Sequence, residues 1–453
     1  MFSRILIANR GEIALRIIRT CKRLGIETVV AYSQGDKDAV YLRLADRAIC
    51  IGPPSSKHSY LNVNNLIAAA EVSDVEAVHP GYGFLSENAH FAEVCRACKI
   101  AFIGPHTATI EQLGNKIQAK QLAQKAGVPV IPGSDGPVAD EEAAAQCADK
   151  VGYPVVLKAA AGGGGRGMRV AHNPSSLRAS FHQAKTEAEA AFGDGTLYLE
   201  KFIEHMRHIE VQVLGDEHQR VLTLGERDCT IQRRNQKLIE ESPCPVLDRR
   251  TRYDLQQAAL RLAKVVNYVS AGTVEFIYDL KTGKFFFMEV NTRLQVEHPV
   301  TEMVTSLDLV EEQLRIAGGE KLRWRQKDID ARLAAGGHSI ECRINAEDPA
   351  RGFTPTPGRI ALFCPPSGSH IRMDTHIYSG YSVPPHYDSL LGKLIVRGSD
   401  RIDAIRAMRQ ALGELVLEGV PSTLGLLREI LGHVKFVSGQ YGTSFITSEM
   451  VPG

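Results

Sequence analysis

Residues 153–170 read YPVVLKAAAGGGGRGMRV, a glycine run between two short apolar segments. The glycines at 162–165 have no side chains, so their backbone amides can surround phosphate oxygens, and Lys158 and Arg166 add positive charge. The lysine precedes the glycines and a strand-like segment follows them, which excludes a P-loop and a dinucleotide fingerprint. A flexible linker is the alternative, but two apolar strands do not normally bracket a linker. We therefore predict a hairpin whose glycine tip closes over a triphosphate.

The composition is that of an ordinary globular protein. The chain has 453 residues, which at about 150 residues per domain suggests two to four domains, and 44% of its residues are hydrophobic. The net charge of +1 argues against nucleic acid or an anionic membrane as the main partner. No apolar run approaches the ~18 residues of a membrane span, and the N-terminal one is too short for a signal peptide. Nine cysteines in this length fit reduced thiols, so we expect a cytoplasmic protein.

Strands and helices alternate in the N-terminal part of the chain. Helical spacing at 12–24 stops at Gly25, and strand patterns lie on both sides of it. This alternation predicts βαβ units on a parallel sheet. The first turn, residues 9–12, reads NRGE and lacks the spaced glycines of a dinucleotide site, so NAD binding is not expected. The expected strands are 5–8, 28–31, 48–51, 77–79 and 101–103, with a second helix at 61–72.

A second unit is predicted after a helix at 109–126. A turn-rich joint at 132–137 introduces it, and a helix at 141–151 precedes the glycine segment. A last unit begins near His338, contains several short strands and closes with a helix at 402–416. Strands of the second unit are expected at 197–202, 208–214, 221–226, 273–278 and 284–290.

Residues 271–291 read AGTVEFIYDLKTGKFFFMEVN, two aromatic-rich strands around a short turn. Pairing about Thr282 places Glu275 opposite Glu289, and two carboxylates at that distance repel each other unless a cation lies between them. With the Asn291 oxygen the site has only oxygen ligands, which suits Mg²⁺ or Mn²⁺ bridging nucleotide phosphates. Solvent-exposed glutamates at strand ends are the alternative, which the alternation with phenylalanine disfavours.

Arg293, Gln295 and Glu297 follow this hairpin at every second position. In an extended chain their side chains point to one side. Arg293 and Gln295 can hold a small anion, and Glu297 can take its proton. We expect a carboxylate beside a bound oxyanion to have a raised proton affinity, which suits a general base. A structural ion pair is the alternative, and the position beside the predicted metal hairpin favours the functional interpretation.

Four motifs resemble those of biotin carboxylase, a component of acetyl-CoA carboxylase with the ATP-grasp fold. They are HPGYGFLSEN at 79–88, KAAAGGGGRGM at 158–168, EVNTRLQVEHP at 289–299 and ECRINAED at 341–348. The similarity keeps the same order over nearly the whole chain. It implies an α/β (α+β) protein with an N-terminal Rossmann-like domain at 1–114, an ATP-grasp domain at 115–330 with a mobile lid at about 132–203, and a C-terminal biotin carboxylase domain at 331–445.

The resemblance implies ATP-dependent carboxylation of biotin on a biotin carboxyl carrier protein, with bicarbonate as the carbon source and carboxyphosphate as the intermediate. Glu297 would deprotonate bicarbonate, and Arg343 would stabilise the biotin enolate. Two ions of Mg²⁺ or Mn²⁺ would be held by Glu275, Glu289 and Asn291. The other catalytic and substrate contacts would come from Lys237, Arg293, Gln295 and the Val296 amide.

For ATP, the resemblance implies contacts at both ends of the nucleotide. Lys116 and Lys158 would hold phosphates, and the Glu200 carbonyl would accept from the adenine amino group. Asn235 stands where many relatives have histidine, so we expect it to contact the nucleotide without transferring protons. The remaining members of the nucleotide-binding set would be Gly163, Gly164, Gly165, Met168, Lys201, Ile203, His208, Gln232 and Ile277, together with the metal-binding Glu275 and Glu289.

The expected partners follow from the same resemblance. Carrier domains of the family hold biotin on the lysine of Ala-Met-Lys-Met, and no Met-Lys-Met occurs here, so we expect a separate subunit that works with a carrier protein and carboxyltransferase subunits. This favours acetyl-CoA, in fatty-acid synthesis, over another acyl-CoA or pyruvate. A homodimer is expected, with Arg16 and Arg19 as contributors. Another ATP-grasp ligase is disfavoured by the C-terminal motif, and a catalytically silent subunit by the complete set of catalytic side chains.

Overall fold

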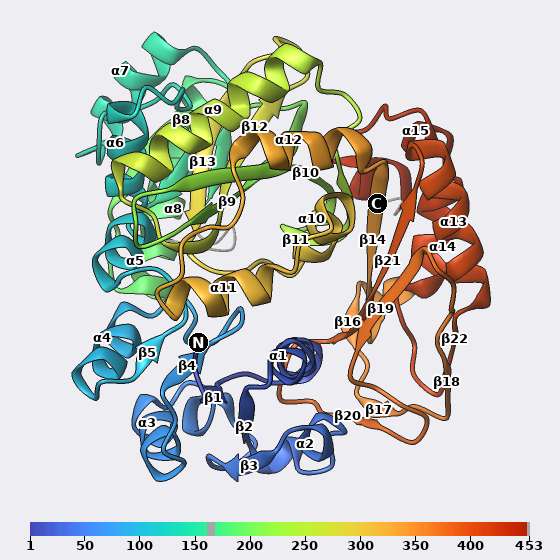
Figure 1. The fold of residues 1–453 in the computed structure, drawn as a ribbon. Coiled ribbons are helices and arrows are strands. Elements are labelled where there is room, and N and C mark those ends of the chain that lie inside the picture. Colours follow the sequence, from blue (N-terminus) through green and yellow to red (C-terminus); the bar gives the residue numbers. More distant parts are fainter. Residues whose placement is uncertain (161–167, 451–453) are drawn as a thin grey trace.

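The computed structural model describes residues 1–160 and 168–450. The mixture of helices and sheets confirms the predicted α/β class. Figure 1 shows an N-terminal unit in blue, a central unit in cyan to yellow and a C-terminal unit in orange to red. The predicted nucleotide contacts Gly163, Gly164 and Gly165 fall outside the described residues. Among those residues, no helix combines the length and apolar character needed to cross a membrane.

The N-terminal unit contains a five-stranded parallel sheet in the order β3-β2-β1-β4-β5, which confirms the predicted βαβ organisation. Helix α1 (Gly11–Leu24) ends at Gly25, whose φ of 73° is a left-handed conformation that glycine adopts without strain. The other elements are β1 (Arg4–Ile7), β2 (Glu27–Tyr32), α2 (Tyr41–Leu44), β3 (Arg47–Cys50), α3 (Val63–Val72), β4 (Ala77–His79), α4 (Ala89–Ala97) and β5 (Ala101–Phe102).

The helical stretch predicted at 109–126 is confirmed, but it consists of two helices. Two helices, α5 (Thr107–Gly114) and α6 (Lys116–Lys125), meet at Asn115. Asn115 has extended backbone angles, and its side-chain oxygen accepts from two amides of α6 at 3.1 and 3.0 Å. An asparagine that caps a new helix ends the preceding one, because its side chain competes with the helical backbone for those donors. The break lets the start of α6 bring Lys116 to the cavity described below.

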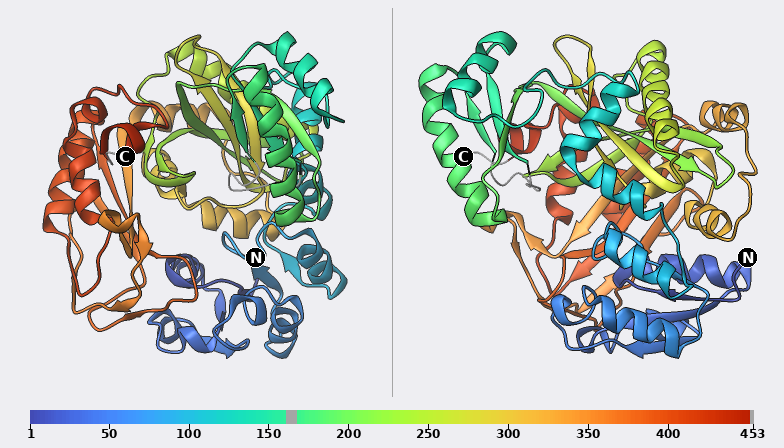
Figure 2. Two further views of the ribbon diagram at one scale, coloured as in Figure 1. Left: turned by 180° about the vertical axis from the view of Figure 1, so that it is seen from behind. Right: turned by 90° about the vertical axis from the view of Figure 1, so that its left-hand side faces the viewer.

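Residues 132–203, the predicted lid, include a small unit with its own core, and Figure 2 shows it as a separate lobe. Its antiparallel sheet has the order β7-β6-β8, and β6 pairs with β7 as predicted for the strands that flank the glycines. Leu157, Phe181 and Leu199 are among the buried side chains that hold it together. The elements are α7 (Glu141–Val151), β6 (Val155–Ala159), β7 (Arg169–Ala171), α8 (Pro174–Phe192) and β8 (Leu197–Lys201).

The central and C-terminal units share one antiparallel sheet of eight strands, in the order β13-β12-β9-β10-β11-β14-β21-β19. Strand β11 (Gln236–Ser242) pairs with β14 (His338–Asn345) and so joins the units through backbone hydrogen bonds. No strand is predicted at β11, because carboxylates interrupt the apolar pattern of its sequence, QKLIEES. The other strands are β9 (Met206–Gly215), β10 (Val221–Arg233), β12 (Ser270–Asp279), β13 (Phe285–Asn291), β19 (Ile371–Thr375) and β21 (Leu390–Gly398).

Helices cover this sheet on both sides of the junction. Helix α9 (Arg249–Val265) packs on β9 and β10, and α13 (Arg401–Glu414) packs on β14 and β21. The remaining helices are α10 (His298–Thr305), α11 (Leu309–Ala317), α12 (Gln326–Ala335), α14 (Leu424–Gly432) and α15 (Val434–Val437). Three small sheets pair β15 (Glu347–Asp348) with β16 (Thr354–Pro355), β17 (Gly358–Arg359) with β20 (Ser382–Val383), and β18 (Leu362–Cys364) with β22 (Val416–Glu418).

Ion pairs at Glu302 join the central unit to the other two. Arg16 of α1 lies 2.7 Å from Glu302 of α10 and 2.8 Å from Asp308, and Arg372 of β19 lies 2.7 Å from Glu302. Arg16 is only 7% exposed and its guanidinium is engaged within the chain; its contribution to a subunit contact stays a prediction. Arg19, the other expected contributor, is exposed.

Glu241 of β11 ties the shared sheet to the C-terminal helices. Its carboxylate accepts hydrogen bonds from His338 at 2.7 Å, from Arg401 at 2.6 and 3.0 Å, and from the Tyr441 hydroxyl. Burial opposes ionisation, but His338 and Arg401 hold the pKa of Glu241 well below its usual range. The carboxylate is therefore ionised in the folded protein.

We expect Glu241→Gln to lower the free energy of unfolding at pH 7 by about 3–5 kcal/mol, because the substitution leaves the largely buried Arg401 guanidinium without its counter-charge. The folded-state pKa lies below the unfolded value of about 4.3, so this stability is present above that pH and is lost as the pH falls. Urea unfolding at pH 7 and pH 4 should show the difference shrinking with acidity. Glu429→Gln, at an exposed position, is the control, and a difference that does not depend on pH would contradict the assignment.

Candidate active site

A cavity of about 640 Å³ opens where the three units meet. The lid, the shared sheet, the loop after β4 and the start of the C-terminal unit all supply lining side chains. Among the predicted site residues that the structure describes, Glu200 alone does not line it. The predicted residues that do are Lys116, Lys158, Met168, Lys201, Ile203, His208, Gln232, Asn235, Lys237, Glu275, Ile277, Glu289, Asn291, Arg293, Gln295, Val296, Glu297 and Arg343.

Glu275 and Glu289 lie directly opposite each other on β12 and β13, as predicted. The pairing about Thr282 is confirmed for residues 273–275, but nearer the turn Phe276 pairs with Phe287, so the register shifts between there and Glu275. Continued from the turn, the pairing would place Met288 opposite Glu275. The shift inserts one extra residue, as a β-bulge does, and this brings the two carboxylates together.

The two carboxylates have different surroundings. Glu275 accepts from His208 Nε2 at 2.9 Å, from Asn291 Nδ2 at 2.8 Å and from Lys237 Nζ at 3.1 Å. Over 1–160 and 168–450, no hydrogen bond or ion pair reaches the Glu289 carboxylate. Burial and the charge of Glu275 raise the pKa of Glu289. A carboxylate held beside a second one, with no direct ion pair of its own among the described residues, fits a divalent cation, and Asn291 offers a further oxygen.

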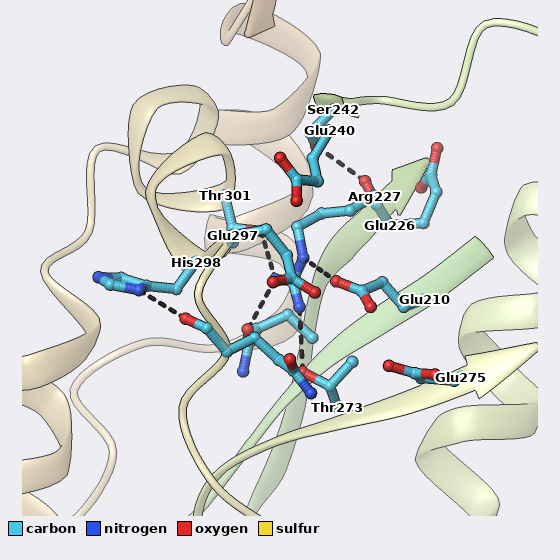
Figure 3. Close-up of polar contacts among 12 residues, drawn as sticks. Glu210, Glu226, Arg227, Glu240, Ser242, Thr273, Glu275, Glu297, His298 and Thr301 are labelled. Atoms are coloured by element: carbon cyan, nitrogen blue, oxygen red, sulfur yellow. Dashed lines mark hydrogen bonds and ion pairs between the residues drawn. The ribbon is translucent and has the colours of Figure 1, made fainter. Parts of the chain in front are cut away.

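Lys237 of β11 is the centre of a buried ionic cluster. Its Nζ lies 2.7 Å from Glu210, 3.1 Å from Glu275 and 2.6 Å from Glu297. Figure 3 shows these three carboxylates directed toward a common space. Although burial opposes it, the three carboxylates raise the pKa of Lys237 well above its usual value. One ammonium group therefore connects Glu275 of the opposed pair with the predicted base.

Glu297 is completely buried, and its carboxylate contacts Lys237 at 2.6 Å and Arg343 at 2.7 Å. Burial favours the protonated form, but Lys237, Arg343 and Arg227 outweigh it and hold the pKa of Glu297 well below its usual range. The expected raised proton affinity is therefore wrong. Its physical reason is that the cations that would attract a substrate anion already contact Glu297 itself.

Residues 292–297 do not form the extended segment that the alternation predicts. The chain turns after β13, and Glu297 becomes the residue that precedes α10. Arg293 Nη1 donates to Gln295 Oε1 at 3.2 Å, and its Nε donates to Glu87 at 2.8 Å. The three predicted side chains still line one cavity, but a turn rather than β geometry brings them there.

Arg343 of β14 lies beside Glu297 at the other side of the cluster. Its Nε donates to Glu240 at 2.6 Å, and its Nη2 donates to Glu297 at 2.7 Å. Glu240 is completely buried on the neighbouring strand β11. The pair of carboxylates holds a planar and permanently charged donor against the cavity, a geometry suited to an oxyanion.

The predicted nucleotide contacts of the lid make ion pairs and hydrogen bonds of their own. Lys158 Nζ lies 2.7 Å from the Glu200 carboxylate. Lys201 Nζ donates to the carbonyls of Gly152 and Tyr153 at 2.9 and 2.7 Å, so its ammonium group supports the lid and only its stem is available to a ligand. Asn235 has a φ of 67° in the tight turn between β10 and β11, a left-handed conformation that asparagine tolerates.

Sequence reasoning missed several buried partners of the site. Arg227 contacts Glu210 at 2.5 Å and donates to Thr273 and Thr301, as Figure 3 shows. Charged residues within segments that also carry strand-forming apolar residues are the signal that could have found Glu210, Arg227 and Glu240, because a buried charge is unfavourable unless it is paired. The other missed residues are Glu87, within a quoted motif, and Lys120, 3.1 Å from Glu200.

Three protein-family models match the chain, in an order that agrees with the motifs. They are the biotin carboxylase N-terminal domain at residues 1–110, the carbamoyl-phosphate synthase L chain ATP-binding domain at 115–325, and the biotin carboxylase C-terminal domain at 341–448.

Relatives and solved structures extend this similarity over the whole chain. The biotin carboxylase of Nostoc sp. is 54% identical over 445 residues, 98% of each chain. A biotin carboxylase β,γ-ATP complex from Campylobacter jejuni superposes with a TM-score of 0.94, at 50% identity and 99% coverage of both chains. The biotin carboxylase domain dimer of Hydrogenobacter thermophilus 2-oxoglutarate carboxylase, solved with MgADP, ADP and bicarbonate, gives a TM-score of 0.92 at 47% identity, covering 99% of this chain and 97% of that one.

Proposed function

The chain belongs to the biotin carboxylase family, and we propose that it carboxylates biotin on a carrier protein with ATP and bicarbonate. It is an ATP-dependent ligase with the ATP-grasp fold. The supporting observation is that Lys237 contacts both Glu275 of the opposed pair and the buried Glu297. We assign the family's three domains to residues 1–114, 115–330 and 331–445, with the lid at about 132–203.

ATP is assigned to the cavity beneath the lid. Lys116 and Lys158 would contact its phosphates, and the glycine tip, with Gly163, Gly164 and Gly165, would close over them. Two ions of Mg²⁺ or Mn²⁺ would be held by Glu275, Glu289 and Asn291, and they supply charge neutralisation for the transferred phosphoryl group. The other assigned nucleotide contacts are Met168, Glu200, Lys201, Ile203, His208, Gln232, Asn235 and Ile277.

Bicarbonate is assigned to Arg293, Gln295 and the Val296 amide, beside Glu297. Bicarbonate is a poor electrophile, and phosphorylation converts it to carboxyphosphate. One of its oxygens attacks the γ-phosphorus, its proton passes to Glu297, and the bond to ADP breaks. Lys237 neutralises charge on the transferred group. A bound anion also competes with Glu297 for Lys237, and this competition raises the low proton affinity of the carboxylate.

The second step moves the carboxyl group to biotin. Carboxyphosphate breaks into CO₂ and phosphate, the phosphate takes the N–H proton of the ureido ring, and the resulting enolate attacks CO₂. Arg343 is the group that stabilises this oxyanion, because a guanidinium stays charged throughout. Carboxyphosphate hydrolyses quickly in water, so we assign to the lid the task of excluding water.

For the partners, we favour acetyl-CoA as the final carboxyl acceptor, in fatty-acid synthesis. The chain would work in the cytoplasm as a homodimer, with a separate carrier protein and carboxyltransferase subunits. The second candidate is the biotin carboxylase of another enzyme, acting on a different acyl-CoA or a keto acid. The similarity to a domain of 2-oxoglutarate carboxylase, at 47% identity, supports this second candidate.

ADP release in the presence of ATP, Mg²⁺, bicarbonate and free biotin tests the proposed reaction. We expect release to require bicarbonate and to rise with biotin, and ¹⁴C from bicarbonate to appear in an acid-labile biotin product. Release that needs an amine instead of biotin would indicate another ATP-grasp ligase. No ADP with every substrate present would indicate a silent subunit. The biotinylated protein that co-purifies with the chain would identify the acceptor enzyme.

Glu87 should matter for bicarbonate because it orients Arg293. Its carboxylate accepts from Arg293 Nε at 2.8 Å and from the Thr292 amide at 2.9 Å. We expect Glu87→Gln to raise the KM for bicarbonate about tenfold and to change the KM for ATP less, because a charge-assisted hydrogen bond becomes a neutral one. Steady-state kinetics measure both constants. Glu93→Gln, which removes an exposed partner of Arg96, is the control, and equal changes in the two constants would contradict the role.

A further inference from the structure

The peptide groups on either side of Val296 are both held by buried side chains. The Gln295 carbonyl accepts from His298 Nδ1 at 2.8 Å, and the Val296 carbonyl accepts from Lys393 Nζ at 2.9 Å. His298 carries its proton on Nδ1, since a carbonyl oxygen can only accept. A peptide group is planar, so a bond that holds its oxygen also sets the direction of its N–H. These two donors therefore orient the Val296 amide and the backbone from which Glu297 extends.

The segment has little other support from the backbone. Residues 292–297 lie between β13 and α10 and belong to neither element. The Gln295 carbonyl also accepts from the His298 amide, but that contact is long, at 3.3 Å. Leu294 packs the segment into the core, and otherwise the position of its polar part depends on the side chains that reach it.

Lys393 connects the segment to both outer units. It lies on β21, is completely buried, and its Nζ is 3.0 Å from Glu12 in the first turn of α1. The Tyr82 hydroxyl donates to the same carboxylate. A buried ammonium is unfavourable unless it is paired, and here Glu12 supplies the charge while the Val296 carbonyl supplies a second acceptor. A single side chain thus joins α1, β21 and the segment that carries Glu297.

We propose that Lys393 and His298 are positioning residues for bicarbonate, which hold the Val296 amide and the Glu297 backbone in the geometry that binding and proton transfer need. The proposal rests on the proposed function and deepens it. Neither side chain lines the cavity, so both act through the segment and not on the substrate. Misplacement by about 1 Å can cost about a hundredfold in rate, which gives these distant bonds a measurable effect.

Four variants separate positioning from folding. Lys393→Met removes the donor while keeping an apolar side chain of similar length, and Lys393→Met/Glu12→Gln also removes the carboxylate charge left unpaired. His298→Asn keeps a donor near the Nδ1 position, whereas His298→Leu has none. Lys435→Met, which removes an exposed lysine paired with Glu449, is the control. Two readouts apply: bicarbonate-dependent ADP release without biotin, and amide hydrogen exchange in a peptide spanning 292–300.

The expected result is selective. Both Lys393 variants and His298→Leu should raise the KM for bicarbonate about tenfold or more, with the KM for ATP within about twofold, because only the bicarbonate segment loses its anchors. His298→Asn should keep the KM for bicarbonate close to that of the unaltered protein, because its side-chain amide can still donate to the Gln295 carbonyl. Amide exchange in 292–300 should accelerate about tenfold in the impaired variants, because local opening of this segment becomes easier. Exchange in β9, which the substitutions do not touch, should stay unchanged.

An unchanged bicarbonate KM in the folded double variant would overturn the proposal. Equal losses in His298→Asn and His298→Leu would do the same, as would unchanged exchange in 292–300. Failure of the proposed function is recognised separately, because the unaltered protein would then release no ADP in response to bicarbonate. The exchange comparison would still decide whether Lys393 and His298 hold the segment.

Discussion

Glu297→Gln should reduce bicarbonate-dependent ADP formation by about 10²-fold or more and leave ATP binding nearly unchanged. Glutamine has the same size, and its one oxygen can still accept from Lys237 or Arg343, but it cannot take a proton, and removing a general base typically has an effect of this order. Turnover is measured at saturating substrates, and ATP affinity by calorimetry. A large loss of turnover with unchanged ATP affinity identifies a group that acts in the chemical step.

The control for this prediction is Glu302→Gln, in the second turn of α10. Glu302 is also buried and is paired with Arg16 and Arg372, so its loss tests what a structural carboxylate of the same helix contributes. We expect Glu302→Gln to lower thermal stability and to keep turnover within a few-fold of the unaltered protein. Unchanged turnover in a folded Glu297→Gln protein would remove Glu297 from the role of base.

Glu289→Gln should lower turnover by about 10²-fold or more, and the folded protein should become no less stable. The loss is expected because the carboxylate is assigned to a divalent cation, and removing such charge stabilisation from a phosphoryl transfer costs several kcal/mol. Stability should not fall, because Glu289 faces Glu275 and the repulsion between them disappears. Kinetics at varied Mg²⁺, together with thermal unfolding, measure both effects.

This combination separates a ligand from a structural residue. Substitution of a structural glutamate should lower the stability of the protein, as expected for Glu241. Substitution of a metal ligand that faces a like charge should lower only the activity. Glu204→Gln removes a charge from an exposed position outside the cavity lining and is the control. Retained turnover with an unchanged Mg²⁺ requirement would exclude Glu289 from cation binding.

The parts of the site that sequence reasoning predicted are those that local patterns encode. Two aromatic strands around a short turn predict a hairpin, and the pairing of Glu275 with Glu289 is confirmed. The strands on either side of the glycines are confirmed as β6 and β7. In both places the neighbours in space are also close in sequence, so turn chemistry and alternation suffice.

The parts that it did not predict depend on distant segments. Asn115 divides a predicted helix because its side chain caps α6, a competition that helical spacing does not reveal. The low proton affinity of Glu297 arises from Lys237 and Arg343, which lie on strands far away in the chain. Lys393 looks in the sequence like an ordinary lysine within an apolar strand, and only the fold places it against the segment of Glu297. Contacts between residues that are distant in the sequence depend on the topology of the fold, which local residue patterns do not reveal.

Transfer of oxygen from bicarbonate to phosphate tests the central claim most directly. The protein is incubated with ATP, Mg²⁺, biotin and ¹⁸O-labelled bicarbonate, and the inorganic phosphate released is analysed by mass spectrometry. Because a bicarbonate oxygen attacks the γ-phosphorus and stays with it when CO₂ leaves, we predict one labelled oxygen in each phosphate. Unlabelled phosphate, formed at the same rate, would mean that water and not bicarbonate receives the phosphoryl group, and would contradict the account.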